Sequence, residues 1–210
     1  MLLYLRVLVP GLMLIAGFYP FYYKEKLFDS PVDFNYVILL AILVGSIYYV
    51  SPLQYKMVKG TLAKINANIL SELISIYNSK NLGNPVGTTK KEELLKDKNS
   101  RYLHVFYHIV DNDESLKSKA SISYFYSIFW SATADSVLIN ALATIAYCIL
   151  ALGRDMTYTP FIYLFFAAML LSLILNRYSV GKHMWNSNQQ LDFIRLYHAD
   201  KVSKELAMIL

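Results

Sequence analysis

Residues 133–152 read TADSVLINALATIAYCILAL, and Asp135 is the only formally charged residue in the stretch. Three other apolar stretches cover residues 2–22, 34–51 and 159–176. Each approaches the ~20 residues that an α-helix needs to cross ~30 Å of hydrocarbon. Backbone groups in lipid must form hydrogen bonds within the chain, so each stretch is expected to be helical. The sequence therefore predicts an all-α membrane protein with four transmembrane helices.

The positive charges predict the orientation of these four spans. Seventeen of the 20 Lys and Arg residues lie at the extreme N-terminus, within residues 52–120, or after Asn176. Only Lys24, Lys26 and Arg154 fall in the other two loops. Lys and Arg concentrate in the cytoplasmic loops of membrane proteins. We therefore predict a multi-pass protein of the bacterial inner membrane, with both termini and the long middle segment in the cytoplasm.

The composition agrees with a membrane location. Hydrophobic residues make up 56% of the chain and charged residues 17%, which is too apolar for an ordinary soluble surface. A cleaved signal peptide is the competing interpretation of residues 1–22, because small residues follow the apolar run at Ala16 and Gly17. Arg6 is the only positive residue before that run, and no long exported domain follows, so we favour a retained span.

The long middle segment is predicted to be helical as well. Pro52 can start a helix whose apolar residues recur at helical spacing as far as Lys80. Turn-forming residues 81–87 follow, and the next helix is expected over residues 90–110. A third helix is expected to begin near Ser115 and to continue without a break into the third span. Long helices should therefore leave the bilayer and extend into the cytoplasm.

This pattern predicts four segments and a helical cytoplasmic module. The segments are a first transmembrane hairpin (1–52), a cytoplasmic helical adaptor (53–120), a second transmembrane hairpin (121–177), and a C-terminal cytoplasmic helix that packs on the adaptor (178–210). Roughly 100 cytoplasmic residues can build only a small core, so a homo-oligomer is expected.

The motifs that mark common enzymes are missing from the sequence. It contains no glycine-rich phosphate loop, no HExxH zinc motif and no GxSxG elbow. His104 and His108 stand one helical turn apart and would bind a metal only if Asp111, Asp113 or His183 supplied a third ligand. We therefore predict no catalytic residue, metal or cofactor. A membrane-bound enzyme built on this pair remains a weaker alternative.

A cationic helix face is the stronger functional signal in the middle segment. Arg101, His104 and His108 follow an i, i+3, i+7 pattern, and tyrosines lie nearby in the sequence. Positive side chains pair with phosphates and aromatic rings stack on bases, so this face would suit a nucleotide-like ligand. A solvated face that meets anionic lipid is the alternative. The predicted ligand-binding residues are Lys56, Lys59, Lys64, Arg101, His104 and His108.

A polar stripe runs along the third span. Ser136, Asn140, Thr144 and Tyr147 follow an i, i+4, i+8, i+11 pattern on one helix face. Polar side chains of this kind can join helices by hydrogen bonding. They can also line a water-filled path in an oligomer, in which case these four residues are pore-lining. The sequence leaves both interpretations open.

Two charged residues mark the predicted cytoplasmic ends of the last two spans. Asp135 lies near the start of the third span and Arg177 directly follows the fourth. They are candidate gate or interface charges, and they could pair with each other. A ring of Arg177 around a pore would favour anions, whereas a ring of Asp135 would favour cations.

The layout resembles the membrane effector of the Hailong anti-phage system. The shared features are four spans, a cytoplasmic helical insert, a basic and tyrosine-rich surface, and no catalytic motif. The resemblance implies a homo-tetrameric anion channel that depolarises the membrane when it opens. It also implies that oligodeoxyadenylate, made by a partner nucleotidyltransferase, binds the helical adaptor and holds the channel shut.

Other defence proteins share the same outline. The layout is also similar to the membrane component of the Kiwa system, which would imply a non-conducting membrane sensor or scaffold that recruits a soluble partner. A channel effector of a cyclic-nucleotide system would keep the pore and change the ligand.

Overall fold

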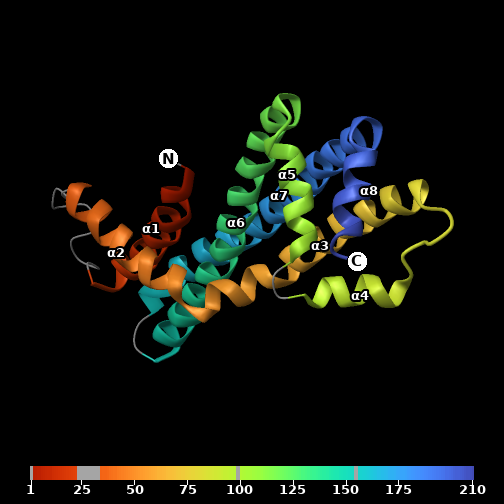
Figure 1. Ribbon diagram of the computed structural model, residues 1–210. Coiled ribbons are helices and arrows are strands. Elements are labelled where there is room, and N and C mark those ends of the chain that lie inside the picture. Colours follow the sequence, from red (N-terminus) through yellow and green to blue (C-terminus); the bar gives the residue numbers. More distant parts are fainter. Residues whose placement is uncertain (1, 23–33, 98–99, 154–155) are drawn as a thin grey trace. The chain divides into compact units, whose positions relative to one another are not determined.

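The computed structural model describes residues 2–22, 34–97, 100–153 and 156–210. Within these residues all regular structure is helical, which confirms the all-α prediction (Figure 1). The α-helices are α1 (Leu2–Tyr22), α2 (Phe34–Val50), α3 (Pro52–Lys80), α4 (Thr88–Lys96), α5 (Arg101–Asp111), α6 (Glu114–Gly153), α7 (Thr159–Tyr197) and α8 (Ala199–Ala207), with one 3-10 turn, η1 (Met156–Tyr158). Lys24, Lys26 and Arg154, which we assigned to the outer side of the membrane, lie outside the described residues.

The chain divides into two compact units. The first unit contains Met1–Lys59 and Ser127–Val180, and the second contains Gly60–Tyr126 and Gly181–Leu210. All three boundaries fall inside helices, so α3, α6 and α7 each contribute residues to both units. The prediction that long helices continue beyond the apolar stretches is confirmed for α6 and α7, which have 40 and 39 residues.

The helices that can cross a membrane have all or part of their length in the first unit. Within the described residues, α6 is long and apolar enough to span a bilayer, and so is α7 together with the η1 turn. Helices α2 and α3 give a third candidate if they are counted together as one span. The chain bends by 63° between them, at the break between Val50 and Pro52. In α1 the apolar segment with described side chains, Tyr4–Gly17, is shorter than a span. The structure therefore supports two or three spanning helices, and the fourth remains a prediction.

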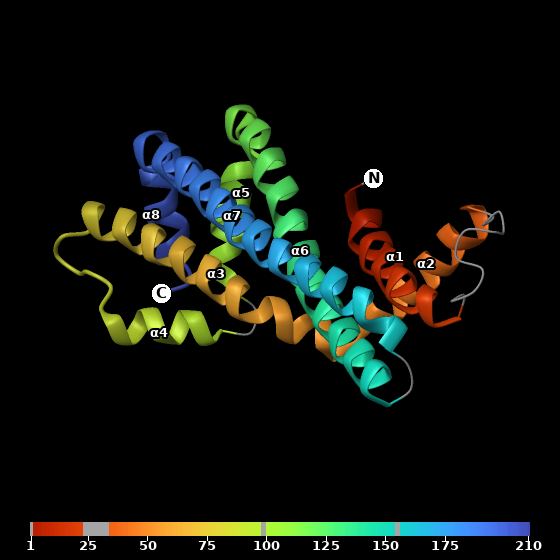
Figure 2. The ribbon, with the colours of Figure 1, turned by 180° about the vertical axis from the view of Figure 1, so that it is seen from behind.

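Helices α1 and α2 approach each other through small residues. The two lie side by side in both views of the ribbon (Figure 1 and Figure 2). A methyl group on Gly11 of α1 would overlap the backbone oxygen of Ala41 on α2. One on Gly45 of α2 would overlap the backbone oxygen of Val7 on α1. Small residues let helix backbones pack closely in lipid, and here both glycines are required for that distance.

The second unit has its own apolar core. Leu70 and Ile74 of α3, Leu94 of α4, Tyr102 of α5 and Leu206 of α8 are buried together. Four helices thus each contribute to one cluster, which explains why α3 and α5 carry apolar residues at helical spacing. Helices α5 and α8 lie next to each other in both ribbon views.

Two helix boundaries differ from the predictions. The single helix expected over residues 90–110 is interrupted after Lys96, and α5 begins at Arg101. Ser100 has a left-handed backbone with φ of 46°, which an α-helix cannot contain. Asp97 and Ser100 belong to the residue types that compete with helical hydrogen bonds, so the break occurs where they stand. The C-terminal helical segment is also divided, because α7 ends at Tyr197 and α8 begins at Ala199.

Candidate functional site

Helix α5 separates its residues into a buried face and an exposed face. Tyr102, Val105, Phe106, Ile109 and Val110 are buried in the second unit. The side chains of Arg101, His104, Tyr107, His108 and Asp111 are exposed. The predicted grouping of Arg101, His104 and His108 on one helix face is therefore present. We call these three residues the α5 cationic face.

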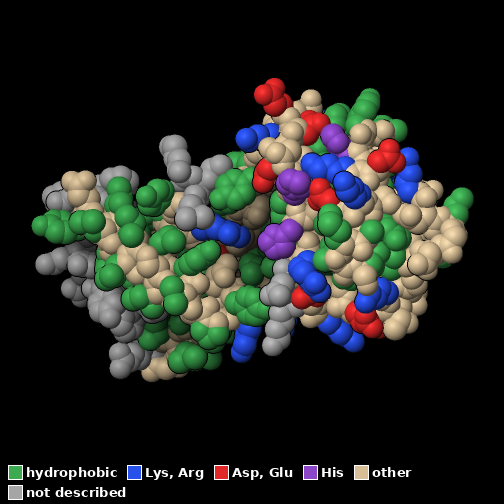
Figure 3. Space-filling view, viewed as in Figure 1, with side chains coloured by type: hydrophobic (Ala, Val, Ile, Leu, Met, Phe, Trp, Pro, Cys, Tyr) green, Lys and Arg blue, Asp and Glu red, His purple; other side chains and the backbone are tan. Residues whose placement is uncertain are grey.

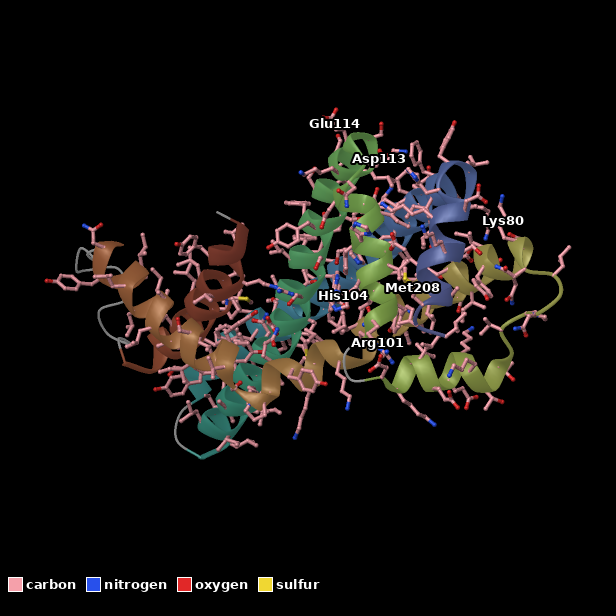
Figure 4. The ribbon with its side chains drawn as sticks, viewed as in Figure 1. Lys80, Arg101, His104, Asp113, Glu114 and Met208 are labelled. Carbon is pink, nitrogen blue, oxygen red and sulfur yellow. The ribbon has the colours of Figure 1, made fainter. Side chains whose placement is uncertain are left out.

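Acidic neighbours already pair with two members of the α5 cationic face. The Nε of Arg101 donates a hydrogen bond of 2.9 Å to Oδ2 of Asp97. The Nδ1 of His108 lies 2.9 Å from Oε1 of Glu205 on α8. For His104 the structure gives no such partner within the described part of the chain. Figure 4 shows Arg101 and His104 in the first half of α5, with Asp113 beyond its other end. An anionic ligand at this face would compete with Asp97 and Glu205.

The predicted lysines are distributed over both units. Lys64 is exposed on α3 and belongs to the second unit with α5. Lys56 and Lys59 belong to the first unit, where Nζ of Lys59 lies 5.8 Å from the ring centre of Tyr55. The six predicted ligand-binding residues therefore lie on two helices: Arg101, His104 and His108 on α5, and the three lysines on α3. Figure 3 shows that most charged and histidine side chains on the visible face gather over the second unit.

The residues considered as metal ligands serve other contacts. Nε2 of His198 lies 2.8 Å from Oδ2 of Asp113, and Nδ1 of His183 lies 2.9 Å from the backbone oxygen of Ser123. No group of three or more His, Cys, Asp or Glu side chains that could hold a metal occurs among the described residues. The His104 and His108 pair therefore gains no third ligand within that part of the chain.

The polar stripe lies in the interior of the first unit. The hydroxyls of Ser136 on α6 and Ser172 on α7 are 2.6 Å apart. The amide nitrogen of Asn140 donates 2.8 Å to the backbone oxygen of Ser136, and Thr144 donates 2.8 Å to the backbone oxygen of Asn140. Tyr147 donates 2.6 Å to the backbone oxygen of Gly17 on α1. The bonds of Ser136 and Tyr147 join α6 to α7 and to α1, whereas those of Asn140 and Thr144 stay within α6. A pore-lining role for the four residues stays a prediction.

Asp135 and Arg177 have different surroundings. Asp135 is 2% exposed and accepts a hydrogen bond of 3.0 Å from the hydroxyl of Tyr48 on α2. Arg177 is exposed, and the structure gives it no contact with Asp135. The acidic residue is thus bonded by α2, and its suggested pairing with Arg177 is not seen.

Sequence reasoning missed several residues that join the helices of the first unit. Asn176 of α7 donates 2.7 Å to the backbone oxygen of Trp130 and 3.1 Å to the hydroxyl of Thr133, both on α6. The contact between α1 and α2 depends on Gly11 and Gly45. The sequence feature that could have predicted this contact is a pair of small residues four positions apart, Ala41 and Gly45. Such spacing is typical of close helix packing in membranes.

The described residues thus offer two polar features of different kinds. One is the α5 cationic face, which is exposed and can bind anions by charge. The other is the buried set around Asp135 in the first unit. Comparison of the chain with protein-family models, curated proteins and solved structures gives no match.

Proposed function

We propose that this protein is a regulated ion-channel effector of the bacterial inner membrane, acting in anti-phage defence. In this proposal four spans form the membrane part, and both termini and the second unit lie in the cytoplasm. Opening would depolarise the membrane. The observation that carries the proposal is the continuity of α3, α6 and α7, each of which contributes residues to both compact units.

Continuous helices supply a physical means of regulation. A ligand changes a conformational equilibrium only if it binds two arrangements with different affinity. An α-helix does not stretch, so a rearrangement of α6 or α7 in the second unit would be transmitted along the same helix. Both helices carry the apolar stretches that can cross the membrane. Ligand binding and conduction would therefore be coupled.

The α5 cationic face is the proposed ligand site. Arg101 and His108 would exchange their bonds to Asp97 and Glu205 for bonds to phosphate, and His104 would add a third contact. Lys64 on α3 would supply further positive charge, as would Lys56 and Lys59. The proposed ligand is oligodeoxyadenylate or another oligonucleotide from a partner nucleotidyltransferase. Anion conduction by a homo-tetramer is part of the proposal.

Ion flux from liposomes tests the proposal. The purified protein is reconstituted, and chloride and potassium fluxes are measured with and without short deoxyadenylate oligomers. Chloride flux that the oligomer suppresses is the expected result. The variant Arg101→Glu should lose at least tenfold in oligomer affinity, whereas Lys117→Glu, an exposed change on α6, should keep it. Unchanged affinity in Arg101→Glu would exclude α5 as the binding face.

A second candidate function is a non-conducting membrane sensor that recruits a soluble partner. The observation that favours it is the bonding of the polar stripe, since Ser136, Asn140, Thr144 and Tyr147 all bond to groups of the same chain. Polar groups that already make hydrogen bonds to the protein depend less on hydrogen bonds to water in a pore. Absence of chloride and potassium flux in every condition would support the sensor, and a soluble protein should then co-purify with the intact membrane protein.

A further inference from the structure

The apolar stretches of α2, α6 and α7 end at one level of the first unit. The hydroxyl of Tyr48, in the last turn of α2, donates a hydrogen bond of 3.0 Å to Asp135, near the start of the apolar part of α6. Asn176, the last residue of the apolar stretch of α7, bonds the backbone oxygen of Trp130 and the hydroxyl of Thr133 on α6. In a bilayer this level would be the boundary between hydrocarbon and head groups.

The chain turns sideways where α2 ends at this level. Helix α3 begins at Pro52 and is bent by 63° relative to α2. Its residues 52–59 belong to the first unit. They extend for about 12 Å along α3, so at this bend they advance by only about 5 Å in the direction of α2. The head-group layer is about 5–7 Å thick on each side of the hydrocarbon, so residues 52–59 stay within it when α2 crosses along the bilayer normal.

Residues 52–59 have the exposed side chains that are typical of a membrane surface. Leu53, Tyr55, Lys56 and Lys59 are exposed, whereas Val58 is buried. The Nζ of Lys59 lies 5.8 Å from the ring centre of Tyr55, one turn earlier. Lys56 precedes Lys59 by three residues, so the two ammonium groups share one helix face. Tyrosine and lysine side chains of this kind anchor helices at the membrane–water interface.

The protein supplies no negative charge to these lysines within the described residues. Asp135 is the single acidic residue in the described part of the first unit, and it is buried. The ion pairs between described residues, such as that of Arg101 with Asp97, all lie in the second unit. Lys56 and Lys59 therefore present positive charge outward, at the level where head groups are expected.

Phosphate is the anion that suits such a pair of lysines, and it could come from a lipid or from an oligonucleotide. The position of residues 52–59 favours the lipid. Lipid phosphates occupy the same layer as these residues, whereas an oligonucleotide has to approach from the water. The exposed Leu53 beside the lysines also fits the apolar boundary of a lipid layer.

We propose that Tyr55, Lys56 and Lys59 bind the head group of an anionic phospholipid, with Leu53 against the upper part of its acyl chains. The two ammonium groups bond the lipid phosphate, and the ring of Tyr55 keeps Lys59 in place. This site rests on the proposed function for the membrane location alone, and it requires neither conduction nor an oligonucleotide. It assigns Lys56 and Lys59 to lipid and leaves the α5 cationic face to the oligonucleotide.

Native mass spectrometry of the full-length protein in mild detergent tests this site. The protein is titrated with phosphatidylglycerol, which is anionic, and with phosphatidylcholine, which has no net charge. The parent should bind phosphatidylglycerol more tightly, and Lys56→Gln/Lys59→Gln should lower that affinity at least about fivefold. The control Lys96→Gln/Lys117→Gln removes two exposed lysines of the second unit and should keep the affinity of the parent. Equal affinities in the two double variants would overturn the site.

Variants of Tyr55 and a competition experiment test the chemistry of the site. Tyr55→Leu removes the ring beside Lys59 and should weaken phosphatidylglycerol binding, whereas Tyr55→Phe keeps a ring and should retain it. Equal binding by these two variants would show that the ring plays no part. Displacement of phosphatidylglycerol by a short deoxyadenylate oligomer would refute a lipid site, because the lysines would then bind the oligonucleotide.

The lipid site and the proposed channel can fail separately. Chloride flux that the oligomer suppresses, together with equal phosphatidylglycerol affinity in both double variants, would overturn the lipid site alone. Absence of flux, together with the expected loss of affinity in Lys56→Gln/Lys59→Gln, would overturn the channel and support the lipid site.

Discussion

The hydroxyl of Tyr147 donates a hydrogen bond of 2.6 Å to the backbone oxygen of Gly17, which joins α6 to α1 across 130 residues of chain. The methyl group of Ala143, one turn before Tyr147, is the nearest atom to the position that a Cβ on Gly17 would take, at 3.8 Å. The ring of Tyr147 stacks on Phe165 of α7 with its centre 5.4 Å away. One side chain of the polar stripe therefore connects three helices of the first unit.

Tyr147→Phe should weaken this connection without changing the packing of the ring. Loss of the hydroxyl removes one interhelical hydrogen bond, and such bonds in membranes contribute about 0.6 kcal/mol and at most about 1.7 kcal/mol. We expect a fall in the free energy of unfolding within this range, measured in mild detergent. Tyr163→Phe, a change at a residue that is 71% exposed, is the control. Equal stability of the two variants would show that the Tyr147 bond contributes nothing.

Substitution of the glycines between α1 and α2 should destabilise the first unit. Gly11→Ala and Gly45→Ala each place a methyl group against the backbone of the facing helix, which must move away. Overpacking of this kind typically costs about 1–3 kcal/mol. Thermal unfolding of the purified protein, followed by tryptophan fluorescence, measures the effect.

Gly181→Ala is the matched control for the glycine variants. Nothing lies within 4 Å of a Cβ added at Gly181, which is inside α7. Alanine is favoured over glycine in a helix by about 0.8–1.0 kcal/mol, so this variant should be as stable as the parent or more stable. If Gly11→Ala behaved in the same way, the close approach of α1 and α2 would be disproved.

Leu206→Ala should detach α8 from the second unit. Leu206 is completely buried with Leu70, Ile74, Leu94 and Tyr102, and its removal leaves a cavity among four helices. Substitutions of this type cost about 2–5 kcal/mol. Hydrogen exchange should show faster exchange of α8 backbone amides. Leu196→Ala, at a residue that is 75% exposed, should change exchange little, and similar exchange in both variants would contradict this core.

The contact between Asp113 and His198 predicts a dependence of stability on pH. The hydrogen bond with His198, and then the one from the Leu116 backbone, lower the pKa of the Asp113 carboxyl. A lowered carboxyl pKa adds stability above the ordinary value near 3.9, and this stability is lost as the pH falls through the lower folded pKa. Asp113→Asn should therefore be less stable than the parent at pH 7, and the difference should shrink below about pH 4.

Urea unfolding followed by circular dichroism at several pH values measures this difference. Asparagine is also a good residue before a helix, so Asp113→Asn keeps an acceptor for the Leu116 backbone at the start of α6, and it removes the charge and the second acceptor oxygen. Asp192→Asn is the control, because Asp192 is exposed and has no ion pair in the described part of the chain. A constant difference between Asp113→Asn and the parent at all pH values would rule out the charge as its cause.

The helices themselves were largely predictable from local sequence. The boundaries of α3 were expected from Pro52 and from the turn residues after Lys80, and α6 was expected to continue from residues near Ser115 into the apolar stretch. The break before Arg101 was not expected, because the apolar spacing on both sides of it suits a helix. The left-handed backbone of Ser100 interrupts the helix at this point. The spacing of apolar residues does not reveal that conformation.

The candidate sites were predictable only as helix faces. The i, i+3, i+7 spacing was sufficient to group Arg101, His104 and His108, since neighbours on a helix face follow from its geometry. Their acidic partners were not predictable, because Glu205 is 97 residues from His108 in the sequence. The same holds for Asp135, whose partner Tyr48 is 87 residues away.

By itself, the sequence determined that this chain is helical and contains segments long and apolar enough to span a membrane, because apolar length and the need to pair every backbone group act within each segment. Only the tertiary structure decided that α1 and α2 meet through Gly11 and Gly45, that Tyr147 bonds Gly17, and that Asp135 is held by Tyr48. These contacts depend on which helix surfaces meet. Helix spacing is a local property, whereas the choice of partner surface is settled by packing among residues far apart in the chain.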